Sequence, residues 1–548
     1  MARRRDPLVR QHHRSTRLFG SLLLVAAAGF SSVAAVPGGA GQAEEAATAT
    51  TPTPLGRVIP APASAVPGGS PYEINSKTRI RVDDSRDAHR IGSYLAGVLR
   101  PSTGYALKVT DDEGRDGIRL RLDAKDKSLG SEGYRLESKR GSVTITARKA
   151  AGLFYGVQTL RQQLPAAAEK TSKQKGPWLV AGGTIKDSPR YEHRGAMLDV
   201  SRHFFSVDKV KRYIDQMSLY KVNKLHLHLS DDQGWRIAID SWPKLATYGG
   251  STQVGGGKGG YYTKAQYKDI VQYAASRQLE VIPEIDMPGH TNAALASYAD
   301  LNCDGVAPPL YTGTEVGFSS LCVKKDITYD FVDDVIREIA AMTPGKYIHI
   351  GGDEAHSTSH EDYVAFMNKV QPVVAKYGKT VIGWHQLTGA TPAKGALAQY
   401  WGYDATGAAE REQVVNAAKK GTKLVLSPAD RSYLDMKYDK DTPLGLSWAG
   451  YVSVQRSYDW DPGTYLAGAP ADSVQGVEAE LWSETLSTSA HIEYMAFPRL
   501  PGIAELGWSP ASTHDWDTYK TRLAEQGPRW DALGIGYYKS PEVPWPGK

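Results

Sequence analysis

The sequence predicts a closed (β/α)8 barrel, an α/β fold, preceded by a small α+β domain. Eight short apolar strands recur with helical segments between them, which favours a closed barrel over an open doubly wound sheet. Polar and aromatic residues gather at or directly after the strand ends, where such a barrel keeps its functional groups. A chain of 548 residues with 41% hydrophobic content can bury more than one core. The expected strands are 196–200, 224–229, 279–285, 346–350, 380–384, 398–401, 423–426 and 476–482.

Residues 72–190 are expected to form the small α+β domain, and residues 191–548 the barrel. The pattern before the barrel alternates short strands with two helical stretches, 87–99 and 150–163. This predicts helices on one face of an antiparallel sheet. No catalytic constellation is found in it. The expected strands are 78–82, 117–122, 134–137 and 143–147.

The first 36 residues have the layout of a secretory signal peptide, with a basic start, an apolar run over 18–30 and small residues near 33–35. The apolar run is shorter than the ~20 residues that a membrane span needs, so an uncleaved anchor is the weaker alternative. Residues 37–71 are rich in Ala, Gly, Pro and Thr and predict a disordered linker. The protein is therefore expected to be secreted, without stable membrane insertion after cleavage.

The formal net charge of +5 gives no reason to expect a nucleic-acid partner. Six arginines and one aspartate in the first 36 residues account for all of it, and the rest of the chain sums to zero.

The two cysteines, Cys303 and Cys322, lie in or beside the Gly- and Pro-containing stretch 302–320. An even pair in an exported loop predicts a disulfide, worth ~3 kcal/mol in the chain-entropy model. Two buried free thiols are the alternative.

The run 347–354 ends in two glycines and two adjacent carboxylates, Asp353 and Glu354. Successive side chains of a strand point to opposite faces, so this pair is not expected to grip one scissile bond from both sides. One of them can be a proton donor, and the other then needs a different task. A solvated pair at the start of a loop is the alternative interpretation.

Four motifs in this order resemble the signatures of the β-N-acetylhexosaminidases of glycoside hydrolase family 20. They are 194–204 (RGAMLDVSRHF), 226–236 (HLHLSDDQGWR), 283–290 (PEIDMPGH) and 349–354 (HIGGDE). The resemblance extends from about Tyr72 to the C-terminus. It implies hydrolysis of terminal β-linked N-acetylglucosamine or N-acetylgalactosamine with retention, in which the acetamide oxygen of the substrate is the nucleophile. No cofactor is expected, and no metal is expected because the set of possible metal ligands is incomplete.

The resemblance also implies the catalytic roles. Glu354 would be the acid and base, with a pKa raised by a partly apolar site. Asp353, kept ionised, would orient the acetamide and stabilise the oxazolinium charge. Tyr433 matches the tyrosine that donates to the acetamide oxygen.

Further residues are expected to bind the sugar. Trp384, Trp401 and Trp482 end strands and would wall a pocket for the acetyl methyl group. Arg202, Asp435 and Glu484 would bind sugar hydroxyls. Two other residues match positions that hold the acid through a hydrogen-bond chain, namely Asp231 and His290. Each could alone be a packing or ion-pair residue.

Two rival functions come from other classes. His226 and His228 share one strand face, and metal-dependent amidohydrolase barrels use such pairs as ligands, but no further ligand set follows. A sugar-binding barrel without catalysis would be expected to lack Asp353, Glu354 or Tyr433, and all three are present. The expected partners are amino-sugar oligosaccharides or glycoconjugates. The sequence leaves open gluco or galacto preference, the natural substrate, the oligomeric state and the role of the insert 249–260.

Overall fold

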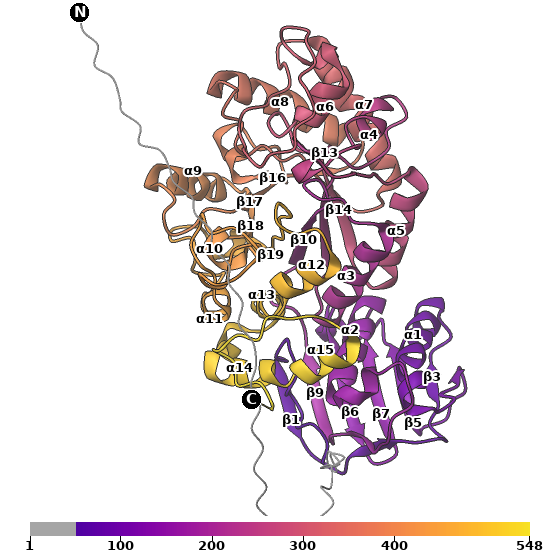
Figure 1. The fold of residues 1–548 in the computed structure, drawn as a ribbon. Helices are drawn as coiled ribbons and strands as arrows, with labels where there is room; N and C mark the ends of the chain where they lie inside the picture. The colour runs from indigo at the N-terminus through magenta and orange to yellow at the C-terminus, as the bar shows by residue number, and fades with distance from the viewer. Residues whose placement is uncertain (1–50, 548) are drawn as a thin grey trace, which may run out of the picture. The chain divides into compact units, whose positions relative to one another are not determined.

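The computed structural model describes residues 51–547, so the predicted signal peptide and residues 37–50 lie outside the described residues. Within that range the chain forms a closed barrel and a smaller sheet domain (Figure 1). No helix among residues 51–547 has the length and apolar character that a membrane span requires.

Eight parallel strands close the barrel, and each overlaps one expected strand, with ends that differ by at most three residues. The last strand pairs with the first, with His193 opposite Gly476. The predicted (β/α)8 barrel is therefore confirmed. The strands are β10 (His193–Asp199), β11 (Lys224–His228), β14 (Glu280–Glu284), β15 (Tyr347–His349), β16 (Thr380–Trp384), β17 (Leu397–Tyr400), β18 (Lys423–Leu426) and β19 (Val474–Ala479).

Amphipathic helices connect the strands and surround the barrel (Figure 1). In α7 (Asp326–Met342), for example, Phe331, Val335 and Ile339 recur every fourth residue and are buried against the strands. The other principal helices are α3 (Val207–Leu219), α5 (Lys264–Ser276), α8 (His360–Lys376), α9 (Ala408–Lys419), α11 (Val454–Tyr458) and α13 (Arg499–Trp508).

Shorter elements complete the fold. A two-stranded ribbon, β12 (Ser230–Asp231) with β13 (Gly234–Trp235), follows the second barrel strand. The remaining helices are α4 (Lys244–Thr247), α6 (Asn292–Ser297), α10 (Ala429–Ser432), α12 (Ser489–Ala496), α14 (Trp516–Ala524) and α15 (Gly527–Leu533).

The small domain contains a seven-stranded sheet against which α1 (Arg86–Thr103) and α2 (Ala150–Gln163) pack. The sheet is mixed, not antiparallel as predicted, because β3, β4, β5 and β7 pair in parallel. Helix α1 follows β3 and returns the chain to the same edge, which produces parallel neighbours. In spatial order the strands are β1 (Ser64–Pro67), β9 (Gly183–Asp187), β6 (Tyr134–Lys139), β7 (Ser142–Ala147), β5 (Gly117–Leu122), β3 (Ile80–Val82) and β4 (Val109–Thr110), and a separate pair joins β2 (Tyr72–Ile74) to β8 (Trp178–Val180).

Residues 51–71 differ from the predicted disordered linker. Ile59 is fully buried in the barrel core, and β1 pairs with β9 along the edge of the small sheet. The backbone N–H of Ala61 donates to Glu505 Oε2 at 2.9 Å. The Ala-, Gly-, Pro- and Thr-rich composition of the whole segment led to the prediction of disorder, although the segment contains a short apolar run at 58–59. This run contacts both the small domain and the barrel.

Candidate active site

The turn after β15 presents the two adjacent carboxylates. Gly351 and Gly352 have φ values of 62° and 100°, in the region that favours glycine. The carboxylate of Asp286 lies inside this turn and accepts the N–H of Gly352 at 3.0 Å. A Cβ on Gly351 would lie only 1.7 Å from Asp286 Oδ1. The turn therefore requires glycine at this position.

Glu354 follows with a φ of 44°, a backbone conformation that is unfavourable for residues other than glycine. Its side chain is 29% exposed, whereas that of Asp353 is 11% exposed. The two carboxylates therefore differ in environment. Glu354 faces the open side of the site, and Asp353 lies deeper.

His290 connects both carboxylates to the interior of the barrel. Its Nε2 lies 3.3 Å from Glu354 Oε2 and 3.5 Å from Asp353 Oδ2, and its Nδ1 lies 3.2 Å from Asp231 Oδ1. Asp231 in turn lies 2.9 Å from the guanidinium of Arg202. The structure thus brings the predicted residues Asp231 and His290 into one chain that ends on Glu354.

The pKa shifts of the carboxylate pair run opposite to the expectation. Burial alone raises the pKa of Glu354, but the hydrogen bond and the positive charge of His290 outweigh it and lower the pKa. Burial raises the pKa of Asp353. The negative charge of Glu354 raises it further, and the positive charge of His290 opposes this only in part. The sequence could not show this reversal, because His290 comes from a different loop and lies between the two groups.

An aromatic wall lies beside the carboxylates. Trp384, Trp482 and Tyr433 are buried in one cluster, against which Trp401 packs. The ring centroids of Trp384 and Trp482 are 5.8 Å apart, and those of Tyr433 and Trp482 are 6.2 Å apart. The predicted aromatic residues therefore come together, although they follow four different strands.

Polar groups form the far rim. The guanidinium of Arg202 lies 4.8 Å from the ring centroid of Trp482, a cation–π contact. Both carboxylate oxygens of Asp435 and one of Glu484 are buried without a hydrogen-bond partner. Burial raises the pKa of Asp435 well above its ordinary value, with a further contribution from Glu484. Buried acceptors without donors are suited to the hydroxyl groups of a bound sugar.

Several residues at the site were not singled out from the sequence. Trp448 is 47% exposed and lies between Trp401 and Tyr433, with ring centroids 6.0 and 5.9 Å from theirs. It belongs to a long loop after α10, where no strand end marks it. Asp286 was part of a quoted motif, and its position two residues after β14 was the available signal.

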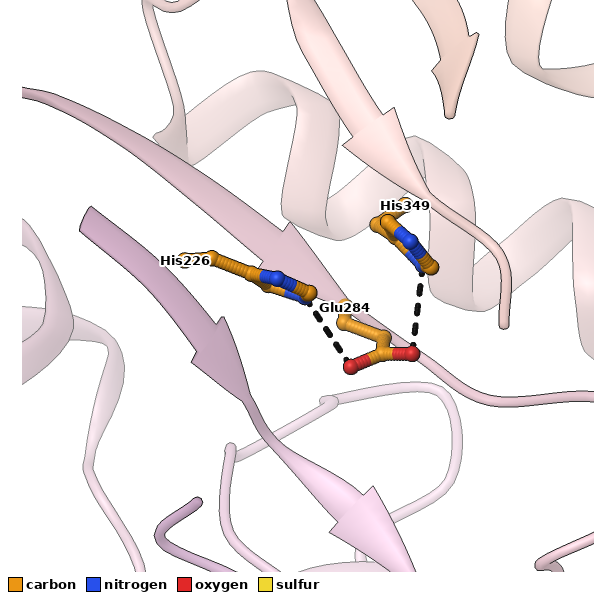
Figure 2. A group of neighbouring side chains, drawn as sticks. All are labelled: His226, Glu284 and His349. Carbon is orange, nitrogen blue, oxygen red and sulfur yellow. Dashed lines mark hydrogen bonds and ion pairs between the residues drawn. The ribbon is translucent and has the colours of Figure 1, made fainter. Parts of the chain in front are cut away.

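The histidine pair considered as metal ligands lies in the barrel interior. His226 is placed between Glu478 and Glu284, and His228 between Glu284 and Asp231, with all four nitrogen–oxygen distances between 2.5 and 3.0 Å. Each ring nitrogen therefore already faces a carboxylate. Figure 2 shows Glu284 between His226 and His349, whose Nδ1 lies 3.1 Å from it. Ion pairing accounts for these histidines.

The predicted disulfide between Cys303 and Cys322 is present, with an S–S distance of 2.07 Å. Its loop packs against the catalytic turn, since a Cβ on Gly317 would lie 3.2 Å from the carbonyl oxygen of Glu354. The backbone N–H of Leu321 also donates to the carbonyl of Pro288. The cross-linked loop therefore supports the segment that carries Glu354.

Comparison with known proteins agrees with this geometry. The catalytic-domain model of glycosyl hydrolase family 20 matches residues 191–511, and the model of domain 2 of that family matches residues 56–188. A β-N-acetylhexosaminidase of Cellulomonas fimi is 42% identical over 481 residues, which cover 87% of this chain and 95% of the relative.

Solved structures show the same similarity. The GH20 β-N-acetylhexosaminidase from Streptomyces coelicolor A3(2) is 74% identical, with a TM-score of 0.89 and coverage of 90% of this chain and 100% of that one. A mutant Streptomyces plicatus β-hexosaminidase in complex with its product GlcNAc is 74% identical, with a TM-score of 0.90 and coverage of 91% and 99%. The chain therefore belongs to glycosyl hydrolase family 20.

Proposed function

We propose that the protein is an exo-β-N-acetylhexosaminidase that removes terminal β-linked N-acetylglucosamine or N-acetylgalactosamine with retention. The observation that carries this proposal is the adjacent pair Asp353 and Glu354 on one glycine turn, together with the aromatic cluster that contains Tyr433. Two carboxylates on neighbouring residues are poorly placed to flank one anomeric carbon. The substrate must then supply the nucleophile, and an acetamide can do so.

In the first step the acetamide carbonyl oxygen attacks the anomeric carbon while the glycosidic bond breaks. Glu354 gives its proton to the leaving oxygen. Asp353 accepts the acetamide N–H, and Tyr433 donates to the carbonyl oxygen, so both orient the group and stabilise the oxazolinium charge. In the second step water attacks the anomeric carbon from the vacated side, the bond between that carbon and the acetamide oxygen breaks to restore the acetamide, and Glu354 takes the proton of that water. Two inversions at one carbon give net retention.

The lowered pKa of Glu354 has a consequence for the first step. His290 Nε2 lies 3.3 Å from Glu354 Oε2, so in the free site the shared proton resides on the imidazole. A bound sugar covers the 29% of Glu354 that is exposed, and desolvation favours a neutral carboxyl group. Substrate binding would thus move the proton from His290 to Glu354, which then gives it to the leaving oxygen.

The other residues of the site would bind the sugar ring and its substituents. Trp384, Trp401 and Trp482 offer apolar surface to the acetyl methyl and the sugar face. Asp435, Glu484 and Arg202 then provide acceptors and donors for the remaining hydroxyls, which is supported by the unpartnered oxygens of the two carboxylates.

We further propose that the protein is exported and acts on amino-sugar oligosaccharides such as chitin fragments. The basic and apolar N-terminal 36 residues and the disulfide support export. Mass spectrometry of the protein recovered from culture medium tests this, because a cleaved signal peptide would place the new N-terminus near residue 37. Intact protein that stays with the cells would contradict export.

The test of the enzymatic proposal compares matched chromogenic β-N-acetylglucosaminide, β-N-acetylgalactosaminide and plain β-glucoside. Cleavage of an N-acetylated substrate with an almost inert glucoside is expected, and a thiazoline mimic of the oxazolinium should inhibit far more strongly than the free sugar. A glycosyl ester on any carboxylate, found by mass spectrometry of enzyme quenched during turnover, would overturn substrate assistance. Loss of activity on exhaustive chelation with rescue by zinc would instead support the amidohydrolase alternative.

A further inference from the structure

A continuous chain of alternating carboxylates and imidazoles crosses the interior of the barrel and ends on Glu354. Every member before Glu354 is at most 3% exposed. The chain starts near the N-terminal end of β10, so it runs from one end of the barrel interior to the catalytic face. In order, with the nitrogen–oxygen distance to the next member, it consists of His193 (2.6 Å), Glu478 (2.7 Å), His226 (3.0 Å), Glu284 (2.5 Å), His228 (2.7 Å), Asp231 (3.2 Å), His290 (3.3 Å) and Glu354.

Glu284 is the branch point of this chain. Its Oε2 faces His226 and His228, and its Oε1 faces His349 Nδ1 at 3.1 Å and accepts the indole N–H of Trp384 at 2.9 Å. Figure 2 shows the carboxylate between the rings of His226 and His349. One carboxylate thus contacts both the wall of the acetamide pocket, through Trp384, and the chain to the acid.

The charges along the chain depend on one another. Burial lowers the pKa of His228, but the charge of Glu284 and the hydrogen bonds of Asp231 and Glu284 outweigh it and raise the pKa far above its ordinary value. Burial raises the pKa of Glu284, and the charges of His228, His349 and His226 reverse this strongly. A buried imidazolium without its carboxylate would lose its proton. Glu284 and Asp231 together hold the positive charge of His228, so loss of the Glu284 charge lowers the pKa of His228.

We infer that Glu284 is a positioning residue for hydrolysis, which fixes at once the orientation of Trp384 and, through His228, Asp231 and His290, the protonation of Glu354. The side chain of Glu284 is fully buried. This inference rests on the proposed function. Beyond its direct contacts, the charge of Glu284 also affects the pKa values of Asp286, Asp353 and Glu480. The charged groups that face Glu354 are His290, Arg202, His356 and Asp353.

The test compares Glu284→Gln with Glu478→Gln. Both changes remove one charge from a fully buried glutamate at hydrogen-bond distance from His226. Only Glu284 also contacts His228 and Trp384. If Glu284 only packs and forms ion pairs, the two variants should change kcat/KM and the pH profile in a similar way. If Glu284 is a positioning residue, the two variants should change them differently.

For Glu284→Gln we expect kcat/KM to fall at least about tenfold more on an N-acetylglucosaminide with a poor leaving group than on an activated aryl glycoside. The basic limb of the pH profile should move upward by about half a pH unit or more. The reason is that only Asp231 then holds the charge of His228, so positive charge is lost at a member of the chain nearer to Glu354 than the lost negative charge, and this raises the pKa of Glu354. Glu478→Gln should lower kcat/KM on both substrates by one common factor and leave the pH profile unmoved.

Equal losses on both substrates in both variants, or an unmoved pH profile for Glu284→Gln, would overturn the inference. His228→Gln is the second variant if Glu284→Gln does not fold, and the same substrate split and upward shift are expected of it. Failure of both to fold would assign the chain to stability alone. The wild type and Glu354→Gln are run alongside, because an inactive wild type or no split for Glu354→Gln would refute the proposed function itself.

Discussion

Replacement of Gly351 by alanine tests whether the turn after β15 sets the catalytic carboxylates. A Cβ at this position would lie 1.7 Å from Asp286 Oδ1 and 2.7 Å from Asp286 Cα. Rotation of the Asp286 side chain would remove the first contact but not the second. The backbone at the end of β14 or of β15 must therefore move.

The cost has three parts. The left-handed conformation costs a Cβ-bearing residue ~1 kcal/mol. The steric overlap adds ~1–3 kcal/mol, and the bond from the N–H of Gly352 to Asp286, 3.0 Å in the wild type, is worth ~1 kcal/mol. Together these give about 3–5 kcal/mol. For 548 residues with an unfolding entropy of ~2.1 cal/mol/K each, Tm falls by ~1 °C per kcal/mol, so about 3–5 °C is expected.

Gly378→Ala is the matched control, because Gly378 has a similar φ of 71° and no atom within 4 Å of the position that a Cβ would take. It should lose only ~1 °C in Tm and no activity. Gly351→Ala should also lose ~100-fold in kcat, since a displacement of ~1 Å at a catalytic group has that effect. Thermal unfolding and kcat on one chromogenic substrate are measured for both. Equal changes in Tm together with retained kcat in Gly351→Ala would refute the reasoning.

Glu354→Gln should lower kcat/KM by ~10²–10⁴ on substrates with poor leaving groups and much less on activated aryl glycosides, and equal losses would contradict its role as the acid. Asp353→Asn should lower kcat while KM changes far less, which steady-state kinetics resolves; a change in KM alone would contradict its role in the transition state. Replacing Cys303 and Cys322, 19 residues apart, by alanine should cost ~3 kcal/mol, and alkylation should find thiols in the native protein only after reduction. Because the pKa of folded His226 is raised to about 10 by Glu284 and Glu478 against burial, its stabilising contribution is complete below about pH 6.5 and is lost as pH rises through about 10. Tm should therefore fall over that window, and a flat profile that matches His226→Gln would contradict this.

The sequence predicts the barrel well because each strand is a compact apolar run that must be buried on both faces. It predicts the small sheet less well. Strands β3 and β5 were expected, but their parallel pairing depends on where α1 returns the chain, which no local pattern encodes. The run 58–59 was overlooked for a different reason: its apolar residues are surrounded by prolines and alanines, and its partners lie more than 100 positions away.

The site residues at strand ends were predictable because barrel topology gathers those ends on one face. The residues beneath them were not. Glu284 and His349 look like ordinary strand positions, and the pairing of β14 with β15 brings them within 3.1 Å of one another. The direction of the pKa shift of Glu354 depends on His290 in the same way. Contacts between distant strands are the part that a single sequence does not contain.

The filling of the barrel changes character directly below the site. Every second residue of a strand points to the barrel axis. On five strands one layer of these positions is apolar and forms a cluster of its own, consisting of Ile282, Tyr347, Ile382, Leu397 and Val425. Two residues further along four of the same strands, the next layer is polar, consisting of Glu284, His349, Trp384 and Gln399.

Barrel interiors of this kind are ordinarily filled by branched aliphatic side chains, and a buried ion pair is often no more stabilising than apolar residues of the same volume. Stability alone therefore gives no reason for the change between the two layers. The polar layer is, however, the one that contacts the wall of the acetamide pocket, since Glu284 accepts the indole N–H of Trp384. It also begins the path through His228 to Glu354. On these strands the apolar positions therefore end where the side chains begin to contact Trp384 and the path to Glu354.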